Sequence, residues 1–219
     1  MTTTWRRPPT AQEAVLAELR RAILEGDLRP GTQILQDTVA ERLGVSRVPV
    51  REALKILEGA GQISYSPHRG YFVAELSYED MVEVYRLREM LEGEAVSVGL
   101  EHVTAEDIAR MEAALVDLEK ADAARDIVAL TAANRRFHFA LFEPCGRPRL
   151  LKLIHQLWDS TDPYRAMYFT DAAGRKRIKK EHREILDAAK AGRASECIKA
   201  MAKHRKNAVK RLRDLLVDA

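Results

Sequence analysis

Four side chains that can bind a metal ion fall on the apolar faces of three predicted helices. They are Asn134, His138, His182 and His204. Asn134 and His138 are four residues apart and therefore share one helix face. A single histidine on an apolar face is usually a satisfied core residue, but three of them with an amide are harder to explain in that way. Imidazole suits Zn²⁺, Ni²⁺, Fe²⁺ or Mn²⁺, so the sequence predicts a divalent metal site.

Arg88 interrupts the apolar pattern of a predicted helix at about residues 77–100. Its guanidinium is therefore expected inside the protein, where it needs an anionic partner. Glu92, one turn further along, can supply that partner as an internal salt bridge. The carboxylate of a bound organic acid can supply it as well, and the two interpretations are compatible.

A third group of side chains with possible chemistry lies in and after the segment LGVSRVPVREAL, residues 43–54. Apolar residues recur at i, i+3, i+4 and i+7 from Val50, which is one face of a helix. Another face carries a cationic row made of Arg47, Arg51 and Lys55. Gly44 can end the preceding helix, and Ser46 can cap the new one. A tight turn before such a helix suits the major groove of DNA, although a solvated surface helix would look similar.

The elements around this basic helix favour the DNA-binding interpretation. Two helices precede it, the second at about residues 36–43, and two β-prone runs follow it at 63–66 and 71–73. This order is that of a winged helix-turn-helix. His68 and Arg69 are then expected at the tip of the wing, within reach of a minor groove or a phosphate.

The rest of the chain is almost entirely helical in its pattern. Six helices are expected at about 77–100, 105–121, 124–143, 147–168, 173–191 and 194–216. Short loops between them predict an antiparallel bundle, which can enclose a ligand cavity. The predicted fold is therefore mainly α, with a flexible arm at 1–9, a winged helix-turn-helix domain at 10–76 and an all-α domain at 77–219.

The composition gives no strong electrostatic signature and is that expected of a cytoplasmic protein. The chain has 219 residues, 46% of them hydrophobic, and a net charge of only +3. One subunit should bind DNA weakly with so mild a charge, so we expect a homodimer that contacts two half-sites. Two cysteines indicate reduced thiols rather than a disulfide framework. Neither a signal peptide nor an apolar run of about twenty residues is evident, so no membrane segment is expected.

Three blocks of the N-terminal part resemble the DNA-binding domain of GntR-type bacterial transcription regulators. These blocks are ILEGDLRPGTQI, LGVSRVPVREALKILEGAG and HRGYFV, and they occur in the order and spacing of that family over roughly residues 10–75. The resemblance implies operator contacts from the matching residues Ser46, Arg47, Arg51, His68, Arg69 and Gly70. Val48 and Lys55, on the same helix, complete the predicted DNA-binding set. Many members carry a base-reading Arg where this chain has Asp37, so their operator sequence is not carried over.

The C-terminal part resembles the FCD ligand-binding domain of the FadR branch of these regulators. The segments NRRFHFAL, EHREILDA and AKHRKNA carry the resemblance, which covers about residues 77–216. It implies a divalent cation, with zinc expected, held by the residues matching Asn134, His138, His182 and His204. Asn134 stands where many members have an Asp, which is a stronger ligand. Six helices would place the chain in the shorter, VanR-like subgroup.

The same resemblance implies a small organic acid as effector. The expected effector-binding residues are Arg88, Glu92, Tyr164 and Arg165. The functional hypothesis is a ligand-responsive DNA-binding transcription regulator, expected to be a repressor, that senses this acid through the bound metal. It is not expected to be an enzyme, and no catalytic residue is assigned.

Two other functions fit parts of the pattern. Three histidines and an amide leave open coordination positions, as in a metal-dependent hydrolase or lyase fused to a DNA-binding module. That alternative lacks an HExxH motif, and no spare carboxylate is expected near the histidines as a general base. The second is a structural zinc site in a bundle whose partner is another protein.

Overall fold

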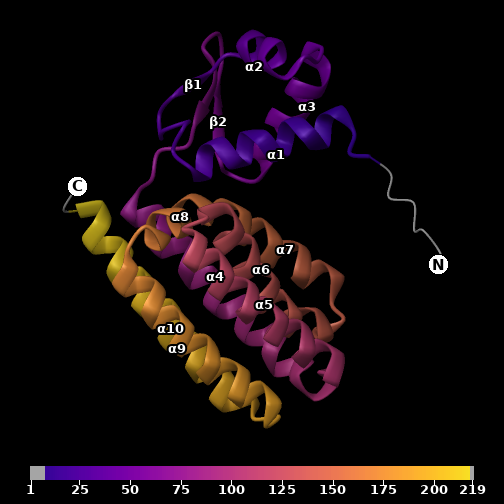
Figure 1. The fold of residues 1–219 in the computed structure, drawn as a ribbon, viewed down its shortest axis with the longest axis vertical. Coiled ribbons are helices and arrows are strands. Elements are labelled where there is room, and N and C mark those ends of the chain that lie inside the picture. The colour runs from indigo at the N-terminus through magenta and orange to yellow at the C-terminus, as the bar shows by residue number, and fades with distance from the viewer. Residues whose placement is uncertain (1–7, 218–219) are drawn as a thin grey trace. The chain divides into compact units, whose positions relative to one another are not determined.

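The computed structural model describes residues 8–217, which form two compact units with their boundary between Glu75 and Leu76 (Figure 1). The predicted boundary, after residue 76, differs by one residue. Most of the arm predicted at 1–9 lies outside the described residues.

The N-terminal unit combines three helices with a small sheet in its described part (Figure 1). Its elements are α1 (Ala11–Leu24), β1 (Gln33–Ile34), α2 (Gln36–Leu43), α3 (Arg47–Gly59), β2 (Ile63–Ser66) and β3 (Gly70–Val73). The middle strand, β3, pairs antiparallel with both β1 and β2. The predicted winged helix-turn-helix order is confirmed, and the two-residue strand β1 is an addition that the sequence did not indicate.

One apolar core fixes α3 in this unit. The buried side chains of α1 and α3 recur at helical spacing and pack together: Val15, Leu19, Ile23, Val50, Ala53, Leu54 and Leu57. The opposite face of α3 is therefore left to solvent. As predicted, α2 ends at Gly44, which adopts φ 64°, in the left-handed region that favours glycine.

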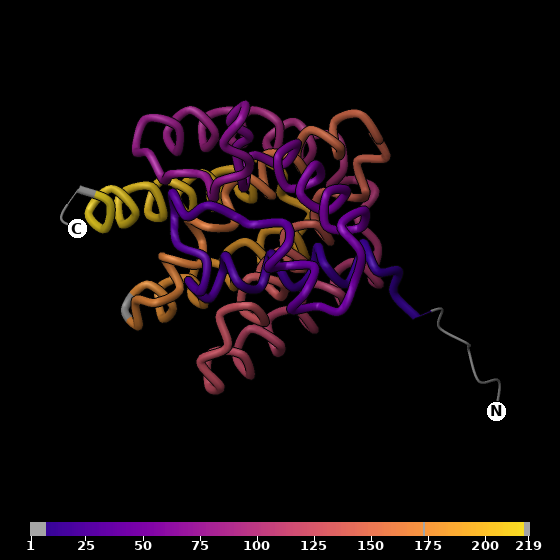
Figure 2. The backbone as a smooth tube through the Cα atoms, turned by 90° about the horizontal axis from the view of Figure 1, so that it is seen from above, coloured from indigo at the N-terminus to yellow at the C-terminus, as the bar shows by residue number. Residues whose placement is uncertain are grey.

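The C-terminal unit is a bundle of long helices. Its α-helices are α4 (Tyr78–Gly99), α5 (Ala105–Ala124), α6 (Ile127–Phe142), α7 (Pro148–Ser160), α8 (Asp162–Phe169), α9 (Ala172–Lys190) and α10 (Ala194–Val217). Helix α5 packs along α6, and α10 packs against both α4 and α9. Figure 2 follows the same backbone from above, from the magenta α4 to the yellow α10. The mainly α fold class is confirmed.

The helix predicted at 147–168 is in fact two helices, α7 and α8. Thr161 separates them with φ −95° and ψ 1°, outside the helical region. Pro163 lies in the first turn of α8, where a missing N–H costs no helical hydrogen bond. The bundle therefore has seven α-helices in the described residues, not six, and the six-helix subgroup assignment loses its basis.

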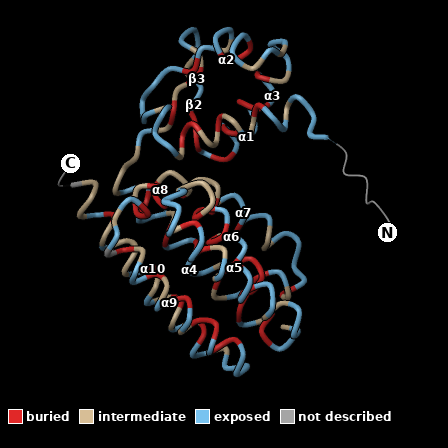
Figure 3. The backbone as a smooth tube through the Cα atoms, in the orientation of Figure 1, coloured by how far each residue is buried: buried red, intermediate tan, exposed pale blue. Residues whose placement is uncertain are grey.

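The buried residues of the bundle line the inward faces of its helices, shown in red in Figure 3. The largest buried side chains include Trp158, Phe137, Phe142 and Phe169. Among the described helices, none is both long and apolar enough to cross a membrane.

Candidate functional site

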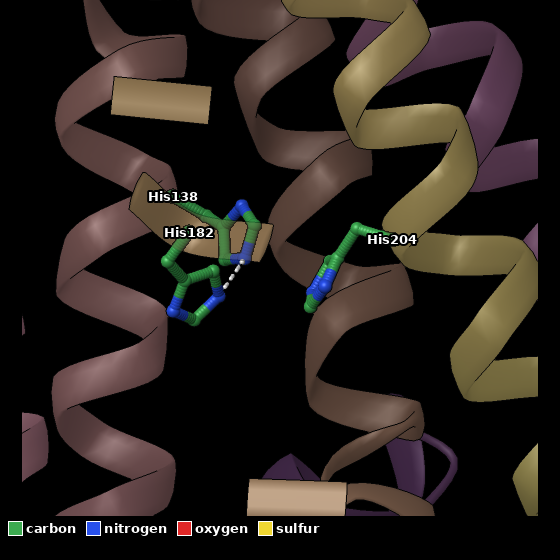
Figure 4. Close-up of side chains that lie close together, drawn as sticks. All are labelled: His138, His182 and His204. Atoms are coloured by element: carbon green, nitrogen blue, oxygen red, sulfur yellow. Dashed lines mark hydrogen bonds between the residues drawn. The ribbon is translucent and has the colours of Figure 1, made fainter. Parts of the chain in front are cut away.

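Three histidines from different helices meet inside the bundle (Figure 4). His138 comes from α6, His182 from α9 and His204 from α10, and each offers a ring nitrogen within 4.8 Å of the others. The Nε2 atoms of His138 and His182 are 3.2 Å apart. Two nitrogens that bind one zinc at about 2.0–2.1 Å in a tetrahedral site are separated by roughly 3.3 Å. The spacing of this pair, which is also that of a hydrogen bond between the two rings, fits two ligands of a shared cation.

The environment of His138 and His182 keeps both rings neutral. Their exposed fractions are 2% and 0%. Burial lowers the pKa of each imidazole well below its usual range, and the other imidazoles of the cluster lower it further. Metals bind the neutral ring, so these two side chains are in the form that coordination requires.

Glu181 orients the third histidine, and no pattern in the sequence predicted this contact. Its Oε2 accepts a hydrogen bond from Nδ1 of His204 at 2.7 Å, and its Oε1 accepts one from Nδ2 of Asn207 at 2.6 Å. A proton on Nδ1 leaves the lone pair on Nε2 of His204, as in the carboxylate–histidine pairs of metal sites. Glu181 is thus a carboxylate near the histidines, but it is not a spare one placed to act as a general base. Both oxygens of this one are already engaged with its two partners.

A small cavity of about 30 Å³ lies beside His204, which is the one histidine of the three in its lining. Its lining includes the polar side chains of Arg88, Asn134, Arg165, His204 and Arg205, together with aromatic residues such as Tyr85 and Trp158. Asn134 is buried one helical turn before His138 on α6. Its amide lies at the cavity with His204, where it can bind a cation or a ligand.

Arg88 is buried, as its place in the apolar pattern predicts, and Glu92 is its partner. The Arg88 Nε donates to Oε1 of Glu92 at 2.8 Å, and the Trp158 Nε1 donates to the same oxygen at 2.7 Å. Burial alone would raise the pKa of Glu92, but Arg88 and Arg205 hold it below its usual range. The internal salt bridge is thus present, and Arg88 also lines the cavity.

Of the neighbours Tyr164 and Arg165, only Arg165 reaches the cavity lining. The Arg165 guanidinium lies 4.2 Å from the centre of the Trp158 ring, and its Nη1 donates to Oγ1 of Thr161 at 2.8 Å. The Tyr164 hydroxyl instead bonds to the backbone N–H and C=O of Ser77, each at 3.0 Å. Burial raises the pKa of Tyr164 to about 12. Tyr164 therefore ties α8 to the start of α4, away from the expected effector site.

Arg205 is a third guanidinium at this cavity that the sequence did not single out. It follows His204 in the run AKHRKNA, and such a cluster of charges is typical of a solvated helix face. The side chain is instead buried, and its Nη1 donates to Oε2 of Glu92 at 2.7 Å. The neighbouring residues do not indicate that Arg205 is buried, because its burial comes from the packing of α10 against α4.

Helix α3 presents the predicted cationic row to solvent. The predicted DNA-binding residues in and before α3 are all exposed: Ser46, Arg47, Val48, Arg51 and Lys55. Ser46 occupies the N-cap position, but its side chain makes no capping hydrogen bond. Its hydroxyl is therefore available for a contact with DNA, and the predicted capping role is wrong. Arg47 forms an exposed ion pair with Asp37 of α2.

The predicted wing tip lies in the turn between β2 and β3. His68 and Arg69 are exposed there, and His68 adopts φ 62°. Gly70 adopts φ 91°, which favours glycine. The Gln33 side chain donates to the backbone C=O of Arg69 and so braces the turn from β1.

Comparisons with known proteins agree with both units. The profile of the family "Bacterial regulatory proteins, gntR family" matches residues 11–73, and that of the "FCD domain" matches residues 83–207. The chain belongs to the GntR regulators with an FCD domain. It is therefore a transcriptional regulator, and a hydrolase or lyase activity has no support, because the matched families and relatives are regulators and not enzymes.

Two curated relatives and two solved structures illustrate the similarity. The chain is 32% identical to the HTH-type transcriptional regulator McbR of Escherichia coli (strain K12) over 146 residues, which are 67% of this chain and 66% of that protein. It is 26% identical to the Nta operon transcriptional regulator of Aminobacter aminovorans over 178 residues, 80% of this chain and 82% of that protein. The structure of E. coli McbR/YncC matches with a TM-score of 0.82 and 27% identity, covering 95% of this chain and 100% of that one. A putative GntR regulator from Rhodococcus sp. RHA1 matches with a TM-score of 0.75 and 26% identity, covering 92% and 96%.

Proposed function

We propose that this regulator senses a small organic acid in its FCD domain and thereby controls operator binding, as a repressor in the cytoplasm. The observation that carries the proposal is the cavity beside His204, with Arg88 and Arg165 in its lining. Guanidinium groups bind carboxylates through paired, charge-assisted hydrogen bonds. A carboxylate is therefore the ligand group that this cavity suits best.

We propose that a divalent metal binds at Asn134, His138, His182 and His204, and we expect this metal to be zinc. The 3.2 Å separation of two Nε2 atoms and the neutral state of the buried rings support this donor set. Ni²⁺, Fe²⁺ and Mn²⁺ accept the same nitrogen ligands. When bound, the metal would supply a positive charge beside the cavity, to which a carboxylate oxygen can bind.

The proposed DNA contacts come from α3 and the wing. Arg47, Arg51 and Lys55 would lie along the major groove with Ser46 and Val48 at the start of the helix. His68, Arg69 and Gly70 would approach the backbone or the minor groove from the wing.

A homodimer is proposed to read two operator half-sites. Exposed apolar side chains on the neighbouring helices α4 and α7, namely Leu87, Met90 and Leu153, offer a face for a second subunit. Sedimentation equilibrium tests this assembly, and a monomer mass at micromolar concentration contradicts it.

The chain offers a short path from the cavity to the DNA-binding unit. The wing strand β3 ends at Val73, and α4, which carries Arg88 and Glu92, begins at Tyr78. A ligand that shifts α4 is therefore expected to act on the wing through residues 74–77. By thermodynamic linkage, operator DNA must change the affinity for the acid by the same factor.

The test uses an operator selected by the protein from a random DNA library. Fluorescence anisotropy gives the Kd for this duplex while short organic acids are titrated, with and without a chelator. We expect one class of acids to weaken operator binding at least fivefold, and the chelator to reduce the effect. An acid that binds without any change in operator Kd rules out the sensor function.

A matched pair of variants separates a ligand contact from a general charge effect. Arg88→Lys keeps the buried charge but loses the planar fork of donors, so it should weaken acid binding. Arg149→Lys, on the exposed surface of α7, is the control and should leave acid binding unchanged. Equal acid affinities in both variants and the wild type would make Arg88 purely structural.

A further inference from the structure

Arg205 has a buried hydrogen-bonding edge with no partner among the described residues. Its Nη1 donates to Glu92, but its Nε and Nη2 are buried and unpaired. These two nitrogens share one edge of the guanidinium, the edge that matches two oxygens of a carboxylate or phosphoryl group. Buried donors without a partner are rare in folded proteins, so this edge indicates a missing acceptor.

The location of Arg205 indicates where that acceptor belongs. Arg205 and Tyr85 line both the inner cavity and a larger groove of about 410 Å³ between α4 and α10. The cavity, at about 30 Å³, has room for only about two water molecules. A ligand larger than two water molecules must therefore extend beyond the cavity. Arg205 and Tyr85, which line both the cavity and the groove, lie on the side where it can do so.

The balance of charges around the cavity also indicates a missing anion. Glu92 accepts hydrogen bonds from two guanidiniums, through Oε1 from Arg88 and through Oε2 from Arg205. Arg165 pairs with Asp162, whose other oxygen lies 3.9 Å from Nη1 of Arg135. Three buried guanidiniums therefore share two carboxylates here. Because a buried charge needs a partner, an additional anion beside Arg205 would stabilise the arrangement.

The outer groove is also suited to a negatively charged ligand. Arg86, Lys203 and Lys206 line it, with Glu89 as the acidic lining residue. Lys203 is paired with Glu184 at 2.7 Å, whereas no ion pair of Arg86 or Lys206 is found among the described residues. A cationic groove that leads to a buried guanidinium can attract an anion and guide it inwards.

We propose that the ligand of this regulator carries two acidic groups, and that the free edge of Arg205 binds the second one. The inference rests on the proposed function, in which the first acidic group binds beside Arg88, Arg165 and the metal site. The ligand class is then a short dianion, either a dicarboxylate or an acid with one carboxylate and one phosphoryl group.

Calorimetry on the full-length, zinc-loaded protein tests this with acids of matched length. Succinate and butyrate both have four carbons, but only succinate has a second carboxylate. We expect succinate to bind the wild type roughly tenfold to a hundredfold more tightly, the range for a charge-assisted, two-donor contact. The compound 3-phosphonopropionate replaces one carboxylate by a phosphonate, and the tighter of the two dianions identifies the preferred group.

Arg205→Lys is the decisive variant, because lysine keeps a cation for Glu92 but lacks the two-donor edge. It should lose most of the preference for the dianion and keep its butyrate affinity. Arg213→Lys, at an exposed position of α10, is the matched control and should retain the preference. A preference that survives in Arg205→Lys overturns the assignment to Arg205.

The wild-type measurement keeps the proposal testable even if Arg205→Lys does not fold. If neither dianion binds the wild type more tightly than butyrate does, the two-group ligand is wrong while the sensor function stands. Both proposals are overturned if none of the three acids binds and their shorter and longer homologues do not bind either.

Discussion

The two oxygens of Glu181 determine how His204 can act. One accepts from Nδ1 of His204 and the other from Asn207, so the ring is fixed with Nε2 free. His138 and His182 have no such partner, since their Nδ1 atoms are buried without a hydrogen bond among the described residues. His204 is therefore the histidine whose orientation depends most on a single neighbouring side chain.

Replacing Glu181 with alanine should weaken metal binding without removing a ligand. The expected loss in zinc affinity is about tenfold to a hundredfold, because His204 loses the acceptor that fixes its tautomer and orientation. Competition with a chromogenic chelator measures it. Glu184→Ala, one turn later on α9, removes only a contact with Lys203 and should keep wild-type affinity. Equal affinities in the two variants would show that Glu181 does not position a ligand.

Asp37 should limit the affinity of α3 for DNA. Its carboxylate pairs with Arg47, and both side chains are about two-thirds exposed. Asp37→Asn would free Arg47 and remove a charge that repels phosphate, so operator binding should tighten about twofold to fivefold, the scale of an exposed ion pair. Anisotropy titrations at several salt concentrations measure the change, with Glu41→Gln on the same helix as the control. Weaker binding by Asp37→Asn would instead indicate that Asp37 positions Arg47 or accepts from a cytosine.

At the scale of elements, helical periodicity predicted much of the site. The burial of Arg88 and His138 follows from their places in an apolar pattern, which depends only on the local helix. The burial of Glu181 and Arg205 depends on how α9 and α10 pack with their neighbours, and no local pattern contains that information. The break at Thr161 was not predicted, because here the local pattern is misleading. The apolar pattern continues across Thr161, and only Pro163 marks the start of the new helix.

Two glycines of α4 should respond in opposite ways to the same substitution. A Cβ at Gly99 would lie 2.7 Å from the backbone N of Cys145, where neither backbone can yield easily, whereas a Cβ at Gly93 meets nothing within 4 Å. Gly99→Ala should lower the free energy of unfolding by about 1–3 kcal/mol through overpacking. Gly93→Ala should raise it by up to about 1 kcal/mol through helix propensity. Urea denaturation measures both, and a stable Gly99→Ala would show that the end of α4 is not held against Cys145.

At the scale of the whole molecule, the chain has a GntR DNA-binding unit and an FCD unit, each with its own buried apolar residues. The three histidines lie far apart in sequence, and they connect α6, α9 and α10 at a single point in the bundle. A metal bound there would cross-link α6 to the two consecutive helices α9 and α10. The metal site is therefore expected to control the stability of the bundle as well as ligand binding.

Removing the metal should loosen the bundle and leave the DNA-binding core intact. A ligand present at a hundredfold excess over its Kd stabilises the folded state by about 2.7 kcal/mol, and chelation removes that contribution. Amide hydrogen exchange should therefore accelerate in α6, α9 and α10 after chelation. The buried face shared by α1 and α3 contains none of the proposed ligands and should keep its protection, which makes it the internal control. Equal exchange in α6, α9 and α10 with and without chelator would contradict a metal link between them, whatever metal the protein contains.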